Sequence, residues 1–313
     1  MPSFLSEMVP WYLRITRANQ AFVSAEGAWN HIRERSLRPQ SYGPPRLLRS
    51  DVTVSASRYE GWPIYTVTPR SRSARGKVAT PPRGNVVYCH GGGWVNEIAP
   101  QHWALAADIA VGAGTTVTVP IYPLIPFGTA DRVIPAFAEL VRANTAEYGA
   151  VCLAGDSAGG QIALSTAALL RDQGHASLPR TVLISPATDL SMSNPEIPVI
   201  QPSDPWLGKA GGLVLGEQWR GSLPIHDPQV SPLFADFSGL GPLTVFCGTH
   251  DILVADVRLM VEKARAAGVE VDYHEGAGLV HVYPLTPTPE GRAASRLIVS
   301  TLRDALSRAE SLR

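Results

Sequence analysis

A chain of 313 residues, 45% of them hydrophobic and 17% charged, is long enough for one large folded domain and too apolar for a disordered protein. Its 27 basic and 27 acidic residues give a formal net charge of zero. Because the Lys and Arg residues are also scattered along the chain, nucleic acid and anionic membrane surfaces are not expected as binding partners.

The three cysteines each lie in an apolar run, at Cys89, Cys152 and Cys247. An odd number of buried thiols does not describe a disulfide framework, so we expect core residues of a protein in a reducing compartment, the cytoplasm. Residues 1–12 lack the basic leader of a signal peptide, and no apolar run is long enough for a transmembrane helix. Neither secretion nor stable membrane insertion is therefore expected.

The N-terminal 50 residues begin with apolar residues at spacings of three and four, namely Phe4, Leu5, Met8, Val9, Tyr12 and Leu13. One side of a helix in this region would therefore be apolar. We expect that side to cover another part of the protein, and peripheral contact with lipid is the alternative.

From residue 51 onward the sequence shows strand-like and helix-like runs. Apolar alternation predicts antiparallel strands at 51–56 and 62–67, followed by a polar loop at 69–84. The further predicted strands are 85–89, 115–120, 151–154, 181–185, 243–247 and 270–274. The predicted helices are 102–111, 132–148, 158–171, 254–267 and 294–305. This alternation predicts an α/β fold with a mostly parallel sheet of about eight strands, flanked by helices.

One segment interrupts the alternation. Residues 186–230 are dense in Pro, Gly and Trp. We therefore predict a single α/β domain at 51–313, with residues 188–228 as an insertion over the sheet and residues 1–50 as a separate helical segment.

Two glycine-rich turns follow predicted strands and carry the chemistry. Residues 155–160 (GDSAGG) lie between a strand and a helix, where Ser157 would be exposed as a nucleophile on a tight turn. Residues 90–94 (HGGGW) follow the strand 85–89. Consecutive glycines leave backbone N–H groups free to face a substrate, so we predict an oxyanion hole from Gly91, Gly92 and Ala158.

These two motifs, in this order and at this separation, resemble the hormone-sensitive-lipase-like carboxylesterases of the α/β-hydrolase superfamily, and the resemblance runs from about Val52 to the C-terminus. Further matches are the segments 204–207 (DPWL), 248–251 (GTHD) and 278–284 (GLVHVYP). One departure is the segment 122–127 (YPLIPF), which lacks the Arg and Glu that the family usually carries there. That departure concerns a buried ion network and no catalytic group.

The resemblance implies the α/β-hydrolase fold with a helical cap, to which the segments 1–50 and 188–228 would contribute. The apolar side of the N-terminal helix would then dock over the active site. The family also suggests a homodimer formed near the final strand, around residues 270–274.

A serine nucleophile needs a base, and the base needs an acid that fixes its tautomer. In this fold the chain order is Ser, then Asp or Glu, then His. Asp251 and His281 follow successive predicted strands, His281 in a glycine-containing loop, so we predict the triad Ser157, Asp251 and His281. The competing side chains are less well placed, because they fall within a helix, a strand or a tight turn: Asp256, Asp272, His274, His250 and His90.

The predicted function is hydrolysis of short-chain acyl esters by a serine carboxylesterase, with a small-molecule ester as the partner and with no cofactor or metal. The alternatives are an amidase or peptidase with the same triad and a non-catalytic small-molecule receptor. The predicted pocket residues are Trp94, Tyr122, Asp156, Trp206, Leu207 and Val282. Asp156 is ambiguous, since it could instead hold the turn around the nucleophile, and we favour that structural role.

Overall fold

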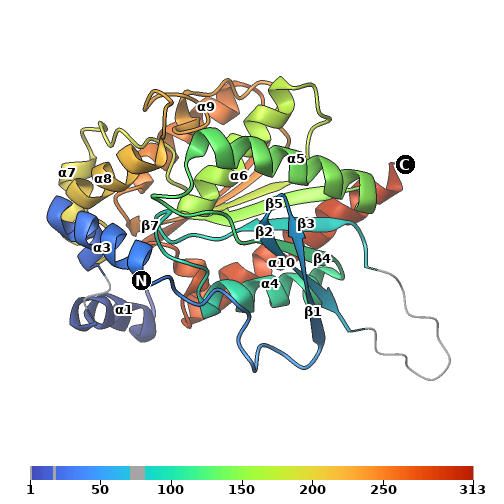
Figure 1. The fold of residues 1–313 in the computed structure, drawn as a ribbon, viewed down its shortest axis with the longest axis horizontal. Coiled ribbons are helices and arrows are strands. Elements are labelled where there is room, and N and C mark those ends of the chain that lie inside the picture. Colours follow the sequence, from blue (N-terminus) through green and yellow to red (C-terminus); the bar gives the residue numbers. More distant parts are fainter. Residues whose placement is uncertain (1, 17–18, 71–81, 313) are drawn as a thin grey trace.

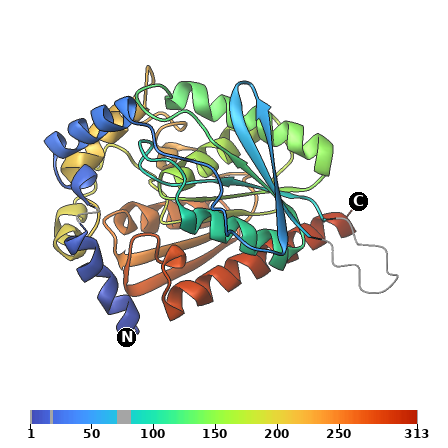
Figure 2. The same ribbon diagram turned by 60° about the horizontal axis from the view of Figure 1, so that its bottom comes forward.

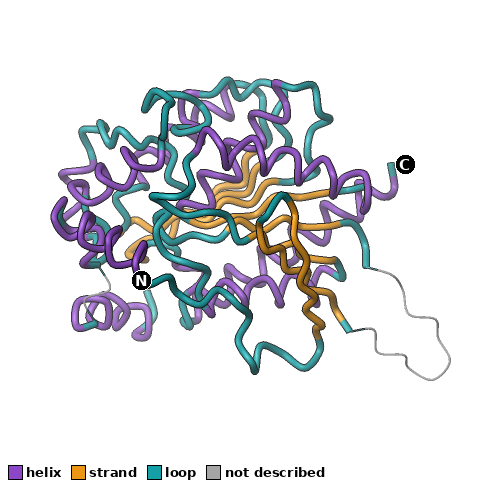
Figure 3. The backbone as a smooth tube through the Cα atoms, in the orientation of Figure 1, coloured by secondary structure: helices purple, strands orange, loops and turns teal. Residues whose placement is uncertain are grey.

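A computed structural model describes residues 2–16, 19–70 and 82–312, so most of the predicted loop at 69–84 lies outside the described residues. An eight-stranded sheet with the order β1-β2-β4-β3-β5-β6-β7-β8 forms its centre (Figures 1 and 3). The strands are β1 Val52–Tyr59, β2 Trp62–Pro69, β3 Asn85–Cys89, β4 Thr116–Pro120, β5 Val151–Asp156, β6 Thr181–Ile184, β7 Leu243–His250 and β8 Val271–Val280. Only the β1–β2 and β2–β4 pairs are antiparallel.

Helices cover both faces of this sheet. In Figure 1, α5 (Ala130–Tyr148), α6 (Ala158–Asp172) and α9 (Val254–Ala266) lie above it, and α4 (Pro100–Ala113) and α10 (Pro289–Ser311) lie below it. Side chains of β3 alternate between two cores, because successive residues of a strand point to opposite faces: Val87 and Cys89 belong to the upper core, Val86 and Tyr88 to the lower one. Burial on both faces explains why the central strands read as continuous apolar runs.

Several strands extend beyond their predicted ends, and three of these extensions reach the site: those of β5, β7 and β8. β5 ends at Asp156, β7 at His250 and β8 at Val280. The glycine-containing segment expected to be a loop before His281 is therefore part of β8, which pairs with β7 as far as His250 and Val280. His281 is the first residue after β8, so it still lies at the same edge of the sheet as Asp251.

The N-terminal segment and the insertion lie together beside the sheet (Figures 1 and 2). The N-terminal segment holds α1 (Phe4–Ile15), α2 (Gln20–Val23) and α3 (Ala25–Leu37), and the insertion holds α7 (Ile197–Ile200) and α8 (Lys209–Trp219). Helices α2 and α3 both contact α8. Short 3₁₀ turns occupy Gln201–Ser203, Pro232–Phe234 and Tyr283–Leu285.

The first helix departs from its prediction. Its apolar side faces solvent, with Phe4 74% and Tyr12 62% exposed, and Leu13 is its buried apolar residue. The helix is held by polar contacts instead, because the Ser3 and Ser6 hydroxyls both donate to the Glu290 carboxylate of α10. The expectation that this apolar side covers another part of the protein is therefore wrong for this structure.

Within the described residues, every helix is too short or too polar to cross a lipid bilayer.

Candidate active site

The nucleophile turn connects β5 directly to α6. Ser157 lies between them with a φ of 53°, a left-handed conformation that is rare for a residue with a side chain and is typical of strained functional positions. The residues two positions before and two positions after Ser157 need to be glycines for steric reasons. A Cβ on Gly155 would collide with the Gly159 carbonyl oxygen, and a Cβ on Gly159 would collide with the Cys89 carbonyl oxygen of β3.

The structure brings Ser157, His281 and Asp251 into one hydrogen-bonded line. His281 Nε2 lies 2.9 Å from Ser157 Oγ, and His281 Nδ1 lies 2.8 Å from Asp251 Oδ2. Asp251 is completely buried and His281 is 3% exposed. The other oxygen of Asp251 accepts the Leu253 N–H at 3.0 Å, which fixes the carboxylate at the start of its loop. Three strand ends, those of β5, β7 and β8, therefore supply the three side chains.

The acid changes the basicity of the histidine. Burial alone would lower the pKa of His281, but the charge and the hydrogen bond of Asp251 outweigh burial and raise that pKa above its ordinary value. Asp204 and Asp156 add smaller contributions in the same direction. The charged imidazolium is thus stabilised, as a general base requires once it has taken a proton.

Two further contacts hold the His281 loop, and the sequence pattern did not reveal the first of them. The buried hydroxyl of Ser185, the residue after β6, accepts the Val282 N–H at 3.0 Å. The indole of Trp206 meets the imidazole of His281 edge-on, with ring centroids 5.8 Å apart. Of the predicted pocket residues, Trp206 therefore packs against His281, and Val282 is held in place through its backbone N–H.

Asp204 links the insertion to the loop of the acid. Its Oδ1 accepts the N–H groups of Trp206 and Leu207 at 2.8 and 2.9 Å, and its Oδ2 accepts the Ile252 N–H at 2.8 Å. Burial, and next the negative charge of Asp251, raise the pKa of Asp204 to about 6. Asp204 therefore positions both Trp206 and the residue that follows Asp251.

The glycine loop at 91–93 differs from its prediction at one position. The Gly91 N–H donates to Asp156 Oδ1 at 3.0 Å, so it is not available to a substrate. The N–H groups of Gly92, Gly93 and Ala158 have no hydrogen-bond partner among the described residues. The structure thus contradicts Gly91 as a donor to substrate, while the N–H groups of Gly92 and Gly93 are left without an internal partner.

Asp156 lies behind that loop and not on a substrate wall. Besides Gly91, its carboxylate accepts the Tyr88 hydroxyl at 2.6 Å and contacts His102 Nε2 at 3.2 Å. His102 Nδ1 accepts the Ala99 N–H, so Nε2 carries the proton and donates to Asp156. Burial alone would raise the pKa of Asp156, but its contacts with His102, Tyr88 and the Gly91 N–H together lower it. This corrects its inclusion among the pocket residues and agrees with the structural role favoured above.

Trp94 and Tyr122 also support the glycine loop from the core. Trp94 is 5% exposed, donates to Gln161 Oε1 at 3.2 Å and stacks on Trp219. Tyr122 is 1% exposed and donates to the His90 carbonyl oxygen at 2.8 Å. Neither forms an open pocket wall, in contrast to the prediction, because both rings fill the core beneath the loop.

Two side chains near Gly93 come from the N-terminal segment and from the insertion. A Cβ on Gly93 would stand 2.8 Å from Phe22 Cε1 of α2 and 3.4 Å from Leu215 Cδ1 of α8. Phe22 was missed by the sequence analysis, because α2 has only four residues and no apolar periodicity. Leu207, a predicted pocket residue, is partly buried against the upper core.

The competing side chains take other roles. Asp256 lies inside α9 and accepts a hydrogen bond from Asn194 at 2.8 Å, and Asp272 pairs with His274 on β8. The three cysteines are free and buried, as predicted, and burial raises the pKa of Cys152 to about 12. A neutral, inaccessible thiol is a poor nucleophile.

The chain is similar to known proteins with the α/β-hydrolase fold. A family model of the α/β-hydrolase fold matches residues 86–285. The triacylglycerol lipase of Mycobacterium tuberculosis (strain ATCC 25618 / H37Rv) is 32% identical over 253 residues, which are 79% of this chain and 51% of that protein, so the chain spans about half of its length. An acetyl-hydrolase of Streptomyces hygroscopicus is 29% identical over 227 residues, 70% of this chain and 75% of that protein.

A solved structure of an esterase from the bacterial hormone-sensitive lipase family matches with a TM-score of 0.72 and 26% identity, over 90% of this chain and 98% of that one. The matched family model covers more than half of the chain and includes the glycine loop, Ser157, Asp251 and His281. The chain belongs to the α/β-hydrolase family, in its hormone-sensitive-lipase-like group of esterases and lipases.

Proposed function

We propose that this protein is a serine carboxylesterase that hydrolyses short-chain acyl esters through an acyl-enzyme. The observation that carries the proposal is the unbroken hydrogen-bonded line from Ser157 through His281 to Asp251. A hydroxyl is a weak nucleophile unless a base accepts its proton, and here the base is in contact with it and is oriented by a buried carboxylate.

In the first half of the reaction, His281 Nε2 takes the proton of Ser157 as Oγ attacks the ester carbonyl. The negative charge that develops on the carbonyl oxygen is held by the N–H groups of Gly92, Gly93 and Ala158. The bond to the alcohol oxygen then breaks, and His281 returns the proton to the departing alcohol. In the second half, water gives a proton to His281 as its oxygen attacks the acyl-enzyme; the bond from the acyl carbon to Ser157 Oγ then breaks, His281 returns the proton to Oγ, and the carboxylic acid is released.

The preference for short acyl chains is supported by the residues above the glycine loop. Phe22 and Leu215 approach Gly93 closely, and Trp206 lies against His281, so little space remains around the reacting carbonyl. The similarity to an acetyl-hydrolase points the same way. The similarity to a triacylglycerol lipase points to longer chains, so acyl length is the property to measure.

We expect kcat/KM for p-nitrophenyl esters to be highest for acetate or butyrate and to fall about tenfold or more at octanoate, because a chain that does not fit loses the binding of its methylene groups and displaces the walls. Replacing Phe22 with alanine should move the optimum toward longer chains. Val23→Ala, an exposed neighbour on the same helix, is the matched control and should leave the profile unchanged. An optimum at octanoate or palmitate in the wild-type protein would contradict the short-chain proposal.

The two alternatives are separable by simple assays. An amidase or peptidase would cleave a p-nitroanilide at a rate comparable to the matching ester, whereas an esterase would not, because the amine is the poorer leaving group. A receptor needs no base, so the close contact between His281 and Ser157 favours an enzyme.

The cytoplasmic location and the homodimer stay predictions. The structure is compatible with the expected dimer contact in one respect, since β8, which contains residues 271–274, is an edge strand with unpaired backbone groups. Light scattering tests the assembly.

A further inference from the structure

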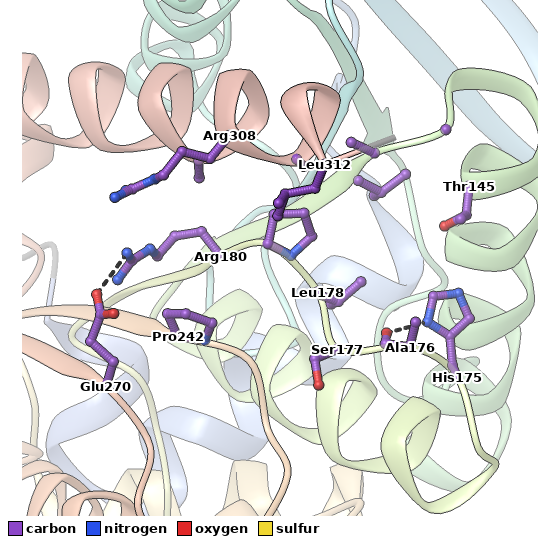
Figure 4. Close-up of a pocket in the computed structure, with 16 residues that line it drawn as sticks. Thr145, His175, Ala176, Ser177, Leu178, Arg180, Pro242, Glu270, Arg308 and Leu312 are labelled. Atoms are coloured by element: carbon purple, nitrogen blue, oxygen red, sulfur yellow. Dashed lines mark hydrogen bonds and ion pairs between the residues drawn. The ribbon is translucent and has the colours of Figure 1, made fainter.

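A pocket lies at the opposite edge of the sheet from the hydrogen-bonded line of Ser157. Its volume is about 490 Å³, and it is bordered by α10, by the loop at 175–180 and by residues that immediately precede β5, β6, β7 and β8 (Figure 4). Ser157 follows the other end of β5, so the length of that six-residue strand, about 20 Å, separates the two places. The pocket is therefore distinct from the proposed active site.

Two arginines give this pocket its charge. Arg180 is 5% exposed, and its Nη2 donates to Glu270 Oε1 at 2.9 Å, while its buried Nε has no hydrogen-bond partner. Arg308 of α10 is exposed and, among the described residues, makes no hydrogen bond or ion pair. Figure 4 shows both guanidinium groups projecting toward the same end of the pocket. One carboxylate against two guanidinium groups leaves a positive charge there.

The rest of the wall is mainly apolar. Its apolar residues come from α10 and the residue after it, from the loop before β6, from the start of β5 and from the residue before β7, and they include Leu178, Pro179, Pro242, Ala305, Ala309 and Leu312. A volume of this size, apolar walls and a few placed polar groups are the usual features of a small-molecule site. A guanidinium group matches a carboxylate in shape and can donate two parallel hydrogen bonds to it.

We infer that this pocket binds an amphiphilic carboxylate, with the carboxylate on Arg308 beside Arg180 and the aliphatic chain along Leu178 and Ala309. The site is an addition to the proposed esterase activity and does not depend on it.

Titration calorimetry with octanoate on the Ser157→Ala protein tests this inference; octanoate is a carboxylate and not an ester, so the heat measured comes from binding and not from turnover. Saturable binding at one site is expected, weakened about tenfold by Arg308→Gln, since a charge-assisted hydrogen bond is lost. Arg303→Gln is the matched control. Arg303 is an exposed arginine on the same helix that does not line the pocket, so this substitution should leave the affinity for octanoate unchanged. Ala309→Trp should block binding by filling the pocket.

Higher salt should weaken octanoate binding to the Ser157→Ala protein and have a smaller effect on its Arg308→Gln derivative, because part of the attraction is between exposed charges. Octanol should bind about tenfold more weakly than octanoate. The inference is overturned by the absence of saturable binding, by equal affinities of the Arg308→Gln and Arg303→Gln proteins, or by octanol binding as tightly as octanoate. None of these outcomes bears on Ser157 as a nucleophile, which is tested separately below.

Discussion

Replacing Asp251 with asparagine is expected to lower kcat by about 10⁴-fold, equivalent to about 5 kcal/mol of transition-state stabilisation. An asparagine side chain can present an N–H₂ group to His281 Nδ1, which would favour the tautomer with the proton on Nε2, the atom that must accept the proton of Ser157. The substitution also removes the charge that stabilises the imidazolium after proton transfer. The folded structure should persist, because asparagine has the same shape and can still accept the Leu253 N–H.

The pH dependence of the same variant gives an independent reading. His281 acts as a base in its neutral form, so kcat/KM should rise as pH increases through its pKa. Because that pKa is raised in the native protein, the acidic limb of the wild-type profile should lie above the ordinary value for histidine, about 6.5. Without Asp251, burial is the remaining large influence and lowers the pKa, so the limb of the residual activity should move to lower pH.

Asp272→Asn is the matched control for the acid, since Asp272 also pairs with a histidine but lies on the exposed part of β8. Its kcat and pH profile should equal those of the wild-type protein. A folded Asp251→Asn protein that kept more than about a tenth of the wild-type kcat would refute the role of the acid, because triad carboxylates contribute far more than that.

Replacing Gly91 with alanine is expected to lower kcat by about 10²- to 10³-fold, the cost of losing an oxyanion donor. The new Cβ would collide with Asp156 Oδ2 and would come within 2.8 Å of the Asp156 carbonyl oxygen. Neither atom can move freely, because Asp156 is held by Tyr88 and His102 and is next to the nucleophile. The loop must therefore move away, and the Gly92 and Gly93 N–H groups move with it.

The control for this variant is Gly43→Ala, at an exposed glycine where a Cβ would have only one ordinary contact, 3.8 Å from the Tyr65 hydroxyl. Thermal unfolding should be measured for both proteins, so that a loss of activity is separated from a loss of fold. Because the displaced donors act chiefly on the transition state, kcat should fall much more than KM rises. Wild-type kcat in a folded Gly91→Ala protein would show that the loop does not depend on Asp156.

The fold and the family follow from features that are local in the sequence. The glycines of 155–160 and 90–94 are required by close backbone approaches, and alternating strand and helix patterns place both turns at the same edge of a parallel sheet. The same rule brings Asp251 and His281 to that edge, since each follows the end of a strand. These predictions depend on topology alone, which periodicity and chain order describe well.

The missed features depend on contacts between residues distant in the chain. The bond from Gly91 to Asp156 joins residues 65 positions apart, and the bond from Val282 to Ser185 joins residues 97 apart. For the apolar side of α1 we predicted a contact that the structure lacks. Periodicity shows that a helix face is apolar but not whether another element lies against it. Phe22 was missed because a single aromatic residue in a four-residue helix gives no periodic pattern, and because its contact with the glycine loop is distant in the chain.

The most direct test of the central claim is the site of covalent modification by a fluorophosphonate, identified by mass spectrometry of the digested protein. The structure predicts one adduct, on the peptide that contains Ser157, formed in parallel with the loss of esterase activity and absent from the Ser157→Ala and His281→Ala proteins. Modification of a different residue, or full esterase activity in a protein whose Ser157 is completely modified, would contradict the account.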